Sequence, residues 1–207
     1  DIRIIDISKE NFEEIKYGDF NFKILKESLG YKIINIPVMK TNQQFGISGA
    51  VENLLRLTDK ESQKLMFENN IHKMLPRFVK ALPKILTIGD ATIGMQGQGP
   101  TTLGEPAFLN LILASRNPIA LDTVFCDITI LKLPKHVENL ENIEVVGNEI
   151  DALRYPIKKP EPNISAHPDI GLVDGKACSA CFNSIMNLTS KLAGVRGERI
   201  RVAIGSL

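Results

Sequence analysis

Polar side chains that could bind a ligand follow two apolar runs of the sequence, residues 31–38 and 85–88. They are Lys40, Thr41, Asn42 and Asp90. Apolar runs of this length are typical of buried strands, and open α/β folds bind ligands at the edge where parallel strands end. A cation, a carboxylate and nearby hydroxyl and amide groups suit a small anionic ligand such as a carboxylate or a phosphate. The alternative is that the lysine is a solvated strand end.

A glycine-rich stretch follows Asp90. We interpret it as a loop whose backbone N–H groups and small hydroxyls bind the ligand, and its candidate residues are Gly97, Gly99, Thr101 and Thr102. The alternative is that the glycines build a long irregular turn. The stretch lacks the third glycine and the following helix of the dinucleotide fingerprint, so it does not support a nucleotide site.

Three further candidates lie on predicted helices. They are Asn53 on a helix over residues 50–57, His72 on a helix over residues 62–82 and Asp122 on a helix over residues 119–131. His72 flanks an apolar stripe, where a hydrogen-bonded core histidine is the alternative. Asp122 also has a structural alternative, because a carboxylate in the first turns of a helix complements the helix dipole. We assign Lys40, His72 and Asp90 as candidate catalytic residues and the others as ligand-binding residues.

The order of these segments predicts the fold class. Apolar runs at residues 31–38, 85–88 and 108–114 alternate with helical patterns, which favours an α/β core with a largely parallel sheet. Because the runs are apolar throughout, we expect cover on both faces and therefore three layers. We place this core at residues 1–150, a proline-rich linker at 151–168 and a βαβ-like segment at 169–207, which could begin a second lobe.

Composition bounds the class of protein. The 207 residues are 43% hydrophobic, and 25 lysines and arginines nearly cancel 24 aspartates and glutamates. This balance argues against a nucleic-acid or membrane partner, and no run is long enough to span a bilayer. Three cysteines fit a reducing compartment, so we expect a cytoplasmic protein. The chain begins at Asp1 without a methionine, so we expect a fragment, and absent targeting signals carry little weight.

Cys178 and Cys181 form a C-x-x-C at the start of a predicted helix. A helix N-terminus favours the thiolate, so the pair could be structural, could form a redox dithiol or could supply half of a four-sulfur metal site. Further ligands for a metal or an iron–sulfur cluster would have to come from Cys126, His167, a missing segment or another chain. We therefore predict no complete metal site in this chain, and a pair that is either reduced or a disulfide.

Several motifs together resemble a known family. They are INIPVMKTNQQFGISGAVENLL, His72, LTIGDATIGMQGQGPTTLGEP and LILASRNPIALDTV, in this order over about residues 31–133. They are similar to the prokaryotic domain of unknown function 362, often described as iron–sulfur-associated, and we expect the usual amino-terminal part of that domain to be missing here. Asn42 stands where the family usually has histidine, and Glu52 where it usually has lysine, which puts chemistry by those two groups in doubt.

Two classes of function follow. The first is an enzyme domain acting on a small anionic metabolite, with redox or metal chemistry as an option. The second is a non-catalytic iron–sulfur-associated or metal-binding module in anaerobic electron transfer. The resemblance implies no settled reaction, so neither a substrate nor a cofactor follows from the sequence.

Overall fold

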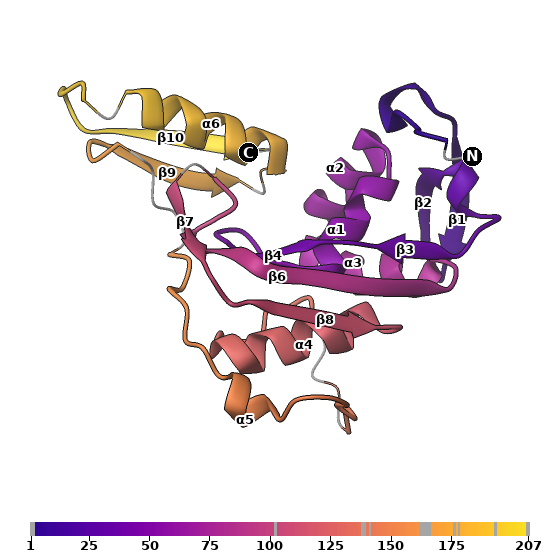
Figure 1. Cartoon of the computed structure of the whole chain (residues 1–207). Helices are drawn as coiled ribbons and strands as arrows, with labels where there is room; N and C mark the ends of the chain where they lie inside the picture. The colour runs from indigo at the N-terminus through magenta and orange to yellow at the C-terminus, as the bar shows by residue number, and fades with distance from the viewer. Residues whose placement is uncertain are drawn as a thin grey trace.

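A mixed sheet of six strands forms the centre of the computed structural model (Figure 1). The model describes residues 3–101, 103–137, 140, 142–161, 167–175, 177, 179–192 and 194–205. The middle strand is β6 (Ile85–Gln98). On one side, β6 pairs in parallel with β3 (Ile33–Asn35) and β4 (Val38–Asn42). On the other side, it pairs antiparallel with β7 (Leu103–Ala107) and β8 (Leu111–Ser115), and β5 (Gly46–Ser48) is antiparallel to β4.

The mixed α/β class is confirmed, and the three apolar runs share one sheet as predicted. The parallel arrangement is limited to β3, β4 and β6. The prediction that parallel strands dominate fails at β8, which is antiparallel to β6. The reason is the connection: β6 turns back directly into β7 and then β8, whereas a parallel strand would need a crossover segment.

β6 is much longer than the sequence predicted. The expected strand over residues 85–88 continues through the glycine-rich stretch, so the interpretation of that stretch as a loop is wrong up to Gln98. A Cβ atom at Gly94 would lie 2.6 Å from the Met39 carbonyl oxygen, and one at Gly99 would lie 2.3 Å from the Thr41 carbonyl oxygen. These two glycines therefore let β6 and the turn after it approach β4 closely.

Helices cover one face of this sheet. They are α1 (Ala50–Asn53), the 3-10 turn η3 (Leu54–Leu57), α2 (Lys60–Glu68), α3 (Ile71–Ala81) and α4 (Pro118–Thr129). Along β6, the buried side chains alternate with more exposed ones, as in a strand with one covered face. Ile85 packs in one cluster with α3, and Ala91 packs in a second cluster with Leu121 and Phe125 of α4. The core therefore lies between this face and the helices.

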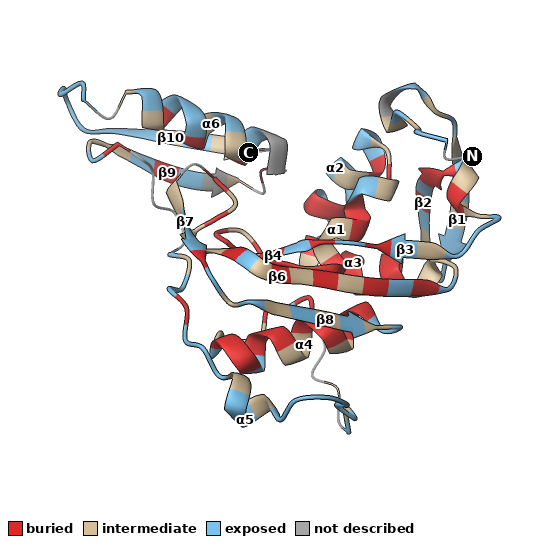
Figure 2. Ribbon diagram, viewed as in Figure 1, coloured by how far each residue is buried: buried red, intermediate tan, exposed pale blue. Residues whose placement is uncertain are grey.

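The opposite face of the sheet is exposed in the described part of the chain (Figure 2). Ile34, Leu86 and Ile112 are 62%, 39% and 61% exposed, and they lie on three neighbouring strands. The expected cover on both faces, and with it the third layer, has no counterpart among the described residues. Apolar alternate positions alone cannot distinguish a strand covered on both faces from one that exposes an apolar face.

Two smaller units flank the sheet. At the N-terminal end, η1 (Ile7–Lys9) precedes the hairpin of β1 (Phe12–Tyr17) and β2 (Phe20–Leu25), which η2 (Lys26–Ser28) follows. Phe22 of β2 contacts Phe78 of α3 with ring centroids 5.5 Å apart. After α5 (Ile150–Leu153), the C-terminal lobe consists of β9 (Ile170–Gly175), α6 (Ser179–Lys191) and β10 (Ile200–Gly205), with β9 and β10 parallel. No helix in the described ranges is both long and apolar enough to cross a membrane.

Candidate functional site

A cavity of about 300 Å³ lies where β4, β5 and α1 meet the C-terminal lobe, and we call it the polar pocket. Its lining residues are Lys40, Asn42, Gln44, Ser48, Glu52, Asn53, Arg56, Pro100, Phe182 and Asn183. Eight of these ten residues carry a polar or charged side chain. Three predicted site residues, Lys40, Asn42 and Asn53, are therefore brought together.

Glu52 is the carboxylate of the polar pocket. Burial raises the pKa of this carboxyl above its ordinary value, and a hydrogen bond from the Ser48 hydroxyl, together with Arg56 and Lys40, opposes the rise. The Asn42 amide nitrogen donates a 2.7 Å hydrogen bond to the Ser48 oxygen. The Ser48 oxygen thus accepts from Asn42, and its own proton can be donated towards Glu52, in line with its effect on the pKa of Glu52.

Asn42 is itself held by the chain around it. Its side-chain oxygen accepts hydrogen bonds from the backbone N–H groups of Gln44 and Phe45, at 2.8 and 3.1 Å. An asparagine that bonds its own backbone in this way shapes the turn between two strands. Both ends of the Asn42 amide are therefore occupied within the protein, and its role here is to position Ser48.

Lys40 supplies a cation from β4. Its ammonium nitrogen donates a 3.0 Å hydrogen bond to the Val38 carbonyl oxygen. Burial lowers the pKa of the Lys40 ammonium; the Glu52 carboxylate opposes that effect, and the Arg56 cation adds to it. Lys40 and Glu52 thus interact with each other electrostatically across the pocket, and each is partly desolvated.

Glu52, Asn53 and Arg56 reach the pocket because α1 and η3 are anchored at both ends. At the start of α1, the Asp122 carboxylate of α4 accepts hydrogen bonds from the Ala50 and Val51 N–H groups, at 2.6 and 2.9 Å. At its end, the Asn53 amide nitrogen donates a 2.8 Å hydrogen bond to the Asn35 side-chain oxygen. The amide of Asn35 in turn donates to the Ala50 carbonyl oxygen at 2.9 Å.

Asp122 therefore lies outside the polar pocket. It positions α1, the helix that carries Glu52 and Asn53 into the pocket. The residue is completely buried, and burial raises the pKa of its carboxyl to about 7 against the effect of the two backbone hydrogen bonds. Gly49, just before α1, makes room for this contact. A Cβ atom there would lie 2.1 Å from an Asp122 carboxylate oxygen.

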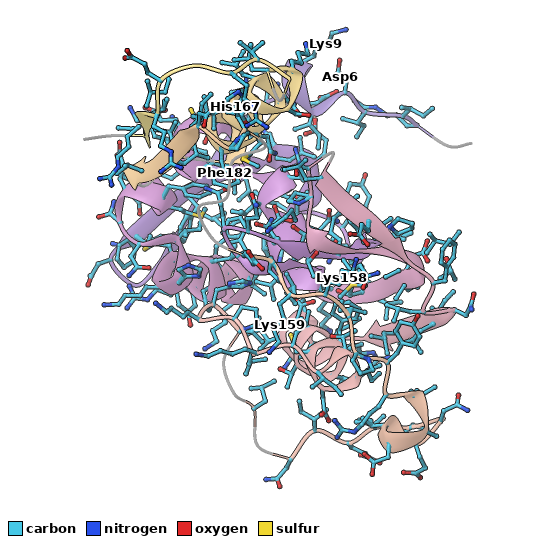
Figure 3. All side chains as sticks on the ribbon, turned by 90° about the vertical axis from the view of Figure 1, so that its left-hand side faces the viewer. Asp6, Lys9, Lys158, Lys159, His167 and Phe182 are labelled. Carbon is cyan, nitrogen blue, oxygen red and sulfur yellow. The ribbon has the colours of Figure 1, made fainter. Side chains whose placement is uncertain are left out.

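The C-terminal lobe closes one side of the polar pocket. Phe182 and Asn183 of α6 line it, and Figure 3 labels Phe182 at the junction of the lobe with the core. Phe182 is buried in the small apolar cluster of the lobe, against which Leu103 of β7 also packs. The Gln44 amide nitrogen donates a 2.9 Å hydrogen bond to the Ala177 carbonyl oxygen. The lobe is thus joined to the core directly beside the pocket.

The other predicted site residues on the sheet lie elsewhere. Asp90 sits in the middle of β6, where hydrogen bonds from the Thr92 hydroxyl and N–H hold the pKa of its carboxyl below the ordinary value. Asp90 does not line the polar pocket. The part of this segment that reaches the pocket is Pro100, which follows the end of β6. The Thr41 hydroxyl donates to the Gly97 carbonyl oxygen at 2.9 Å, and Gly99 packs against Thr41.

The turn after β6 contributes Pro100 to the pocket. The neighbouring Thr101 hydroxyl is occupied locally: it donates to the Gln98 carbonyl oxygen at 2.7 Å and accepts from the Leu103 N–H at 3.2 Å. Thr102 lies outside the described residues.

His72 belongs to a separate place, at the start of α3. Its ring stacks on that of His136 with centroids 5.6 Å apart, and the two Nδ1 atoms are 3.4 Å apart. Phe45 packs edge-on against both rings. Burial lowers the pKa of His72, and it lowers that of His136 to about 3. His72 is thus not grouped with Lys40 or Asp90.

The cysteines do not join the polar pocket. Cys126 is buried in α4, and burial together with Asp122 raises the pKa of its thiol to about 12, so it is a poor nucleophile. Cys181 is exposed on α6, and Cys178 lies outside the described residues. Within the described ranges, no three His, Cys, Asp or Glu side chains are grouped so as to hold a metal ion.

Sequence reasoning selected only three of the ten residues that line the polar pocket. Glu52 was noted only as a departure from a family pattern, and Ser48, Arg56 and the two α6 residues were not selected. One usable signal was the spacing of Glu52 and Arg56, which are four residues apart and so face the same way on helical backbone. Nothing local in the sequence points to Phe182, because its contact with the pocket is a long-range one.

Comparison with known proteins gives a family. A family model described as Domain of unknown function (DUF362) matches residues 1–127, which confirms the resemblance seen in the motifs. The matched range contains the pocket residues from Lys40 to Pro100 and excludes the two from α6. No curated protein and no solved structure matches the chain.

Proposed function

Because the chain belongs to the Domain of unknown function (DUF362) family, whose description names no reaction, we propose a function from the geometry of the polar pocket. The pocket binds a small metabolite that carries a carboxylate or phosphate group, and Glu52 is the acid–base group beside it. The observation that carries this proposal is the grouping of Lys40, Arg56 and Glu52 in one small polar cavity.

The charges favour an anion. Lys40 and Arg56 provide two cations, whereas Glu52 is the only carboxylate among the lining residues. Desolvation disfavours both the charged ammonium of Lys40 and the charged carboxylate of Glu52. An anion bound between Lys40 and Arg56 would restore the interactions that burial removes from the ammonium. A carboxylate or a phosphate also suits the planar donor geometry of arginine.

Glu52 suits proton transfer better than an exposed glutamate does. Its pKa is raised by burial, so its protonated and ionised forms are closer in free energy near neutral pH. The Ser48 hydroxyl holds the carboxylate in place, and Asn42 fixes the orientation of that hydroxyl. A ligand whose acidic proton lies next to its anionic group would place that proton within reach of Glu52.

The binding step is tested by calorimetric titration of the protein with succinate and with inorganic phosphate. We expect Lys40→Met to weaken binding of the anion that the wild type prefers by about tenfold, the effect of one charge-assisted hydrogen bond. Glu52→Gln should strengthen binding, because it removes the negative charge of the pocket while keeping the shape of the side chain. The matched control is Lys60→Met, at an exposed lysine on α2 outside the pocket.

Two results would contradict the proposal. One is an equal effect of Lys40→Met and Lys60→Met, which would mean that only the overall charge matters. The other is binding that Glu52→Gln leaves unchanged, which would place the anion away from the carboxylate. Circular dichroism of each variant shows whether a loss of binding reflects a loss of fold.

A further inference from the structure

A second cavity, of about 420 Å³, is also lined by Gln44, and we call it the His72 cavity. Four basic side chains line it: His72 from α3, Lys132 and Lys135 from the segment after α4, and Lys159 from the segment after α5. These come from three separate parts of the chain. Among the described residues that line it, there is no aspartate or glutamate.

The three lysines are exposed, and no described carboxylate pairs with them. None of them forms an ion pair with a described residue. The neighbouring Lys158 provides the contrast, since its ammonium pairs with Glu105 of β7. Lys135 also lowers the pKa of His72, which shows that the two groups interact electrostatically. Such a concentration of cations without carboxylates creates a positive potential that favours an anion.

The histidine pair adds a donor. His136 is completely buried, and its Nε2 atom has no hydrogen-bond partner among the described residues. If His136 donates through Nδ1 to His72, only an acceptor lone pair is left unpaired at His136 Nε2. The reverse arrangement would bury an unpaired N–H, and orphaned buried N–H groups are rarer than unpaired acceptors. In the favoured arrangement the proton of His72 is on Nε2, the ring nitrogen that does not contact His136.

Besides Gln43, Gln44 and Gly46, the cavity has an apolar wall. It consists of the Phe45 ring together with Leu131, Leu133, Pro134 and Pro160. A small inorganic anion would leave this wall in contact with water. A ligand with an apolar body attached to its charged group would cover the wall and also meet the four basic side chains.

We propose that the His72 cavity binds an organic anion, with a phosphate or carboxylate group facing Lys135, Lys159 and His72 and an apolar body against the leucine and proline wall. The site is separate from the polar pocket, whose lining shares only Gln44 with it. It does not depend on the function proposed for that pocket.

Phenyl phosphate is a suitable probe, with inorganic phosphate for comparison, and binding can be followed by calorimetry and by the NMR signals of the His72 ring. We expect phenyl phosphate to bind at least about tenfold more tightly than inorganic phosphate, because its ring covers apolar wall. Binding should shift the His72 ring signals and raise the pKa of His72, because a nearby anion favours the imidazolium.

Lys158 and Lys159 form a matched pair for mutation, and both are labelled on the extended segment in Figure 3. Lys159 lines the cavity, whereas Lys158 pairs with Glu105 instead. We expect Lys159→Met to weaken phenyl phosphate binding by about fivefold and Lys158→Met by less than about twofold. Both lysines are exposed, so both variants should fold.

The proposal is overturned if the two variants weaken binding equally, if the His72 signals do not respond to phenyl phosphate, or if inorganic phosphate shifts the His72 signals at equally low concentrations. Lys40→Met distinguishes the two sites. It should leave the response of the His72 signals to phenyl phosphate unchanged, and a loss of that response in the variant would contradict a separate site. Failure of succinate binding at the polar pocket has no bearing on these results.

Discussion

The polar pocket and the His72 cavity share Gln44 as a wall, but they are built in different ways. In the polar pocket, charges of both signs are partly desolvated and held by a network of internal hydrogen bonds. In the His72 cavity, exposed lysines without carboxylate partners meet an apolar wall. We therefore expect mutations around the polar pocket to change the stability of the fold and the pKa values of the buried groups. Lysine mutations at the His72 cavity should change ligand binding alone.

Gly49→Ala should give the largest effect and should separate the two sites. The added Cβ would lie 2.1 Å from an Asp122 carboxylate oxygen and 2.9 Å from the Met39 methyl carbon. We expect the contact between α4 and α1 to be broken, at a cost of about 2–3 kcal/mol in the free energy of unfolding. Urea denaturation measures that cost.

The control is Gly30→Ala, because a Cβ atom at Gly30 meets nothing within 4 Å. If the Gly49→Ala protein is still folded, it should lose succinate or phosphate binding at the polar pocket and keep phenyl phosphate binding at the His72 cavity. Loss of both together in a folded protein would show that the two sites are not built independently.

Asp122→Asn should have a smaller effect that depends on pH. The pKa of Asp122 is raised to about 7 in the fold, whereas an unfolded aspartate has a pKa of about 3.9. The folded state therefore holds the proton more tightly, and the associated stability is complete below about pH 4 and is lost as the pH rises to about 7. The variant should lack this part of the pH dependence.

The same variant also leaves one N–H group at the start of α1 without an acceptor, because an amide offers one oxygen where the carboxylate offered two. This should cost about 1–3 kcal/mol at and above about pH 7, where Asp122 is ionised and accepts from both N–H groups. Urea denaturation at pH 4, 5.5 and 7 measures both effects. Equal slopes against pH for the wild type and Asp122→Asn would show that Asp122 does not titrate in this window.

Ser48→Ala should produce the smallest of these effects. It removes the hydroxyl that donates to Glu52, so the pKa of Glu52 should rise further, by less than about one unit for the loss of one hydrogen bond. Anion binding at neutral pH should then strengthen slightly, since more of the glutamate is protonated. Ser184→Ala, at an exposed serine of α6, serves as the control in NMR titrations of the glutamate carboxyls. A downward shift of the Glu52 pKa in Ser48→Ala would contradict the assigned hydrogen bond.

Local patterns were sufficient to predict that the three apolar runs share one sheet and that Lys40, Asn42 and Asn53 lie in one region. They were insufficient for the glycine-rich stretch. Glycine is common in loops, but Gly94 and Gly99 are needed here because a neighbouring backbone lies within 2.6 and 2.3 Å of the missing Cβ atoms. That requirement depends on β4, some fifty residues away, and cannot be read from the stretch itself.

The positions of Asp90 and His72 were predicted wrongly for the same reason, because they depend on distant parts of the chain. Asp90 was expected at a strand end because β6 was taken to stop there, and its true place in mid-strand separates it from Lys40. His72 was expected near Lys40, but a break at Asn70, where φ is 71°, starts a new helix and places the ring beside His136. A single polar residue in the sequence indicates roughly where in the fold it lies. Which polar side chains meet in one site depends on tertiary packing.

The most direct measurement for the polar pocket is a titration of Glu52 by carbon NMR of the labelled carboxyl, with and without the preferred anion. In the free protein, burial should hold the pKa of Glu52 above the ordinary glutamate value. Bound succinate or phosphate should raise it further, because a second negative charge disfavours the ionised carboxylate, and Lys40→Met should abolish that second rise. A Glu52 that titrates at the ordinary value and does not respond to either anion would contradict the proposed site.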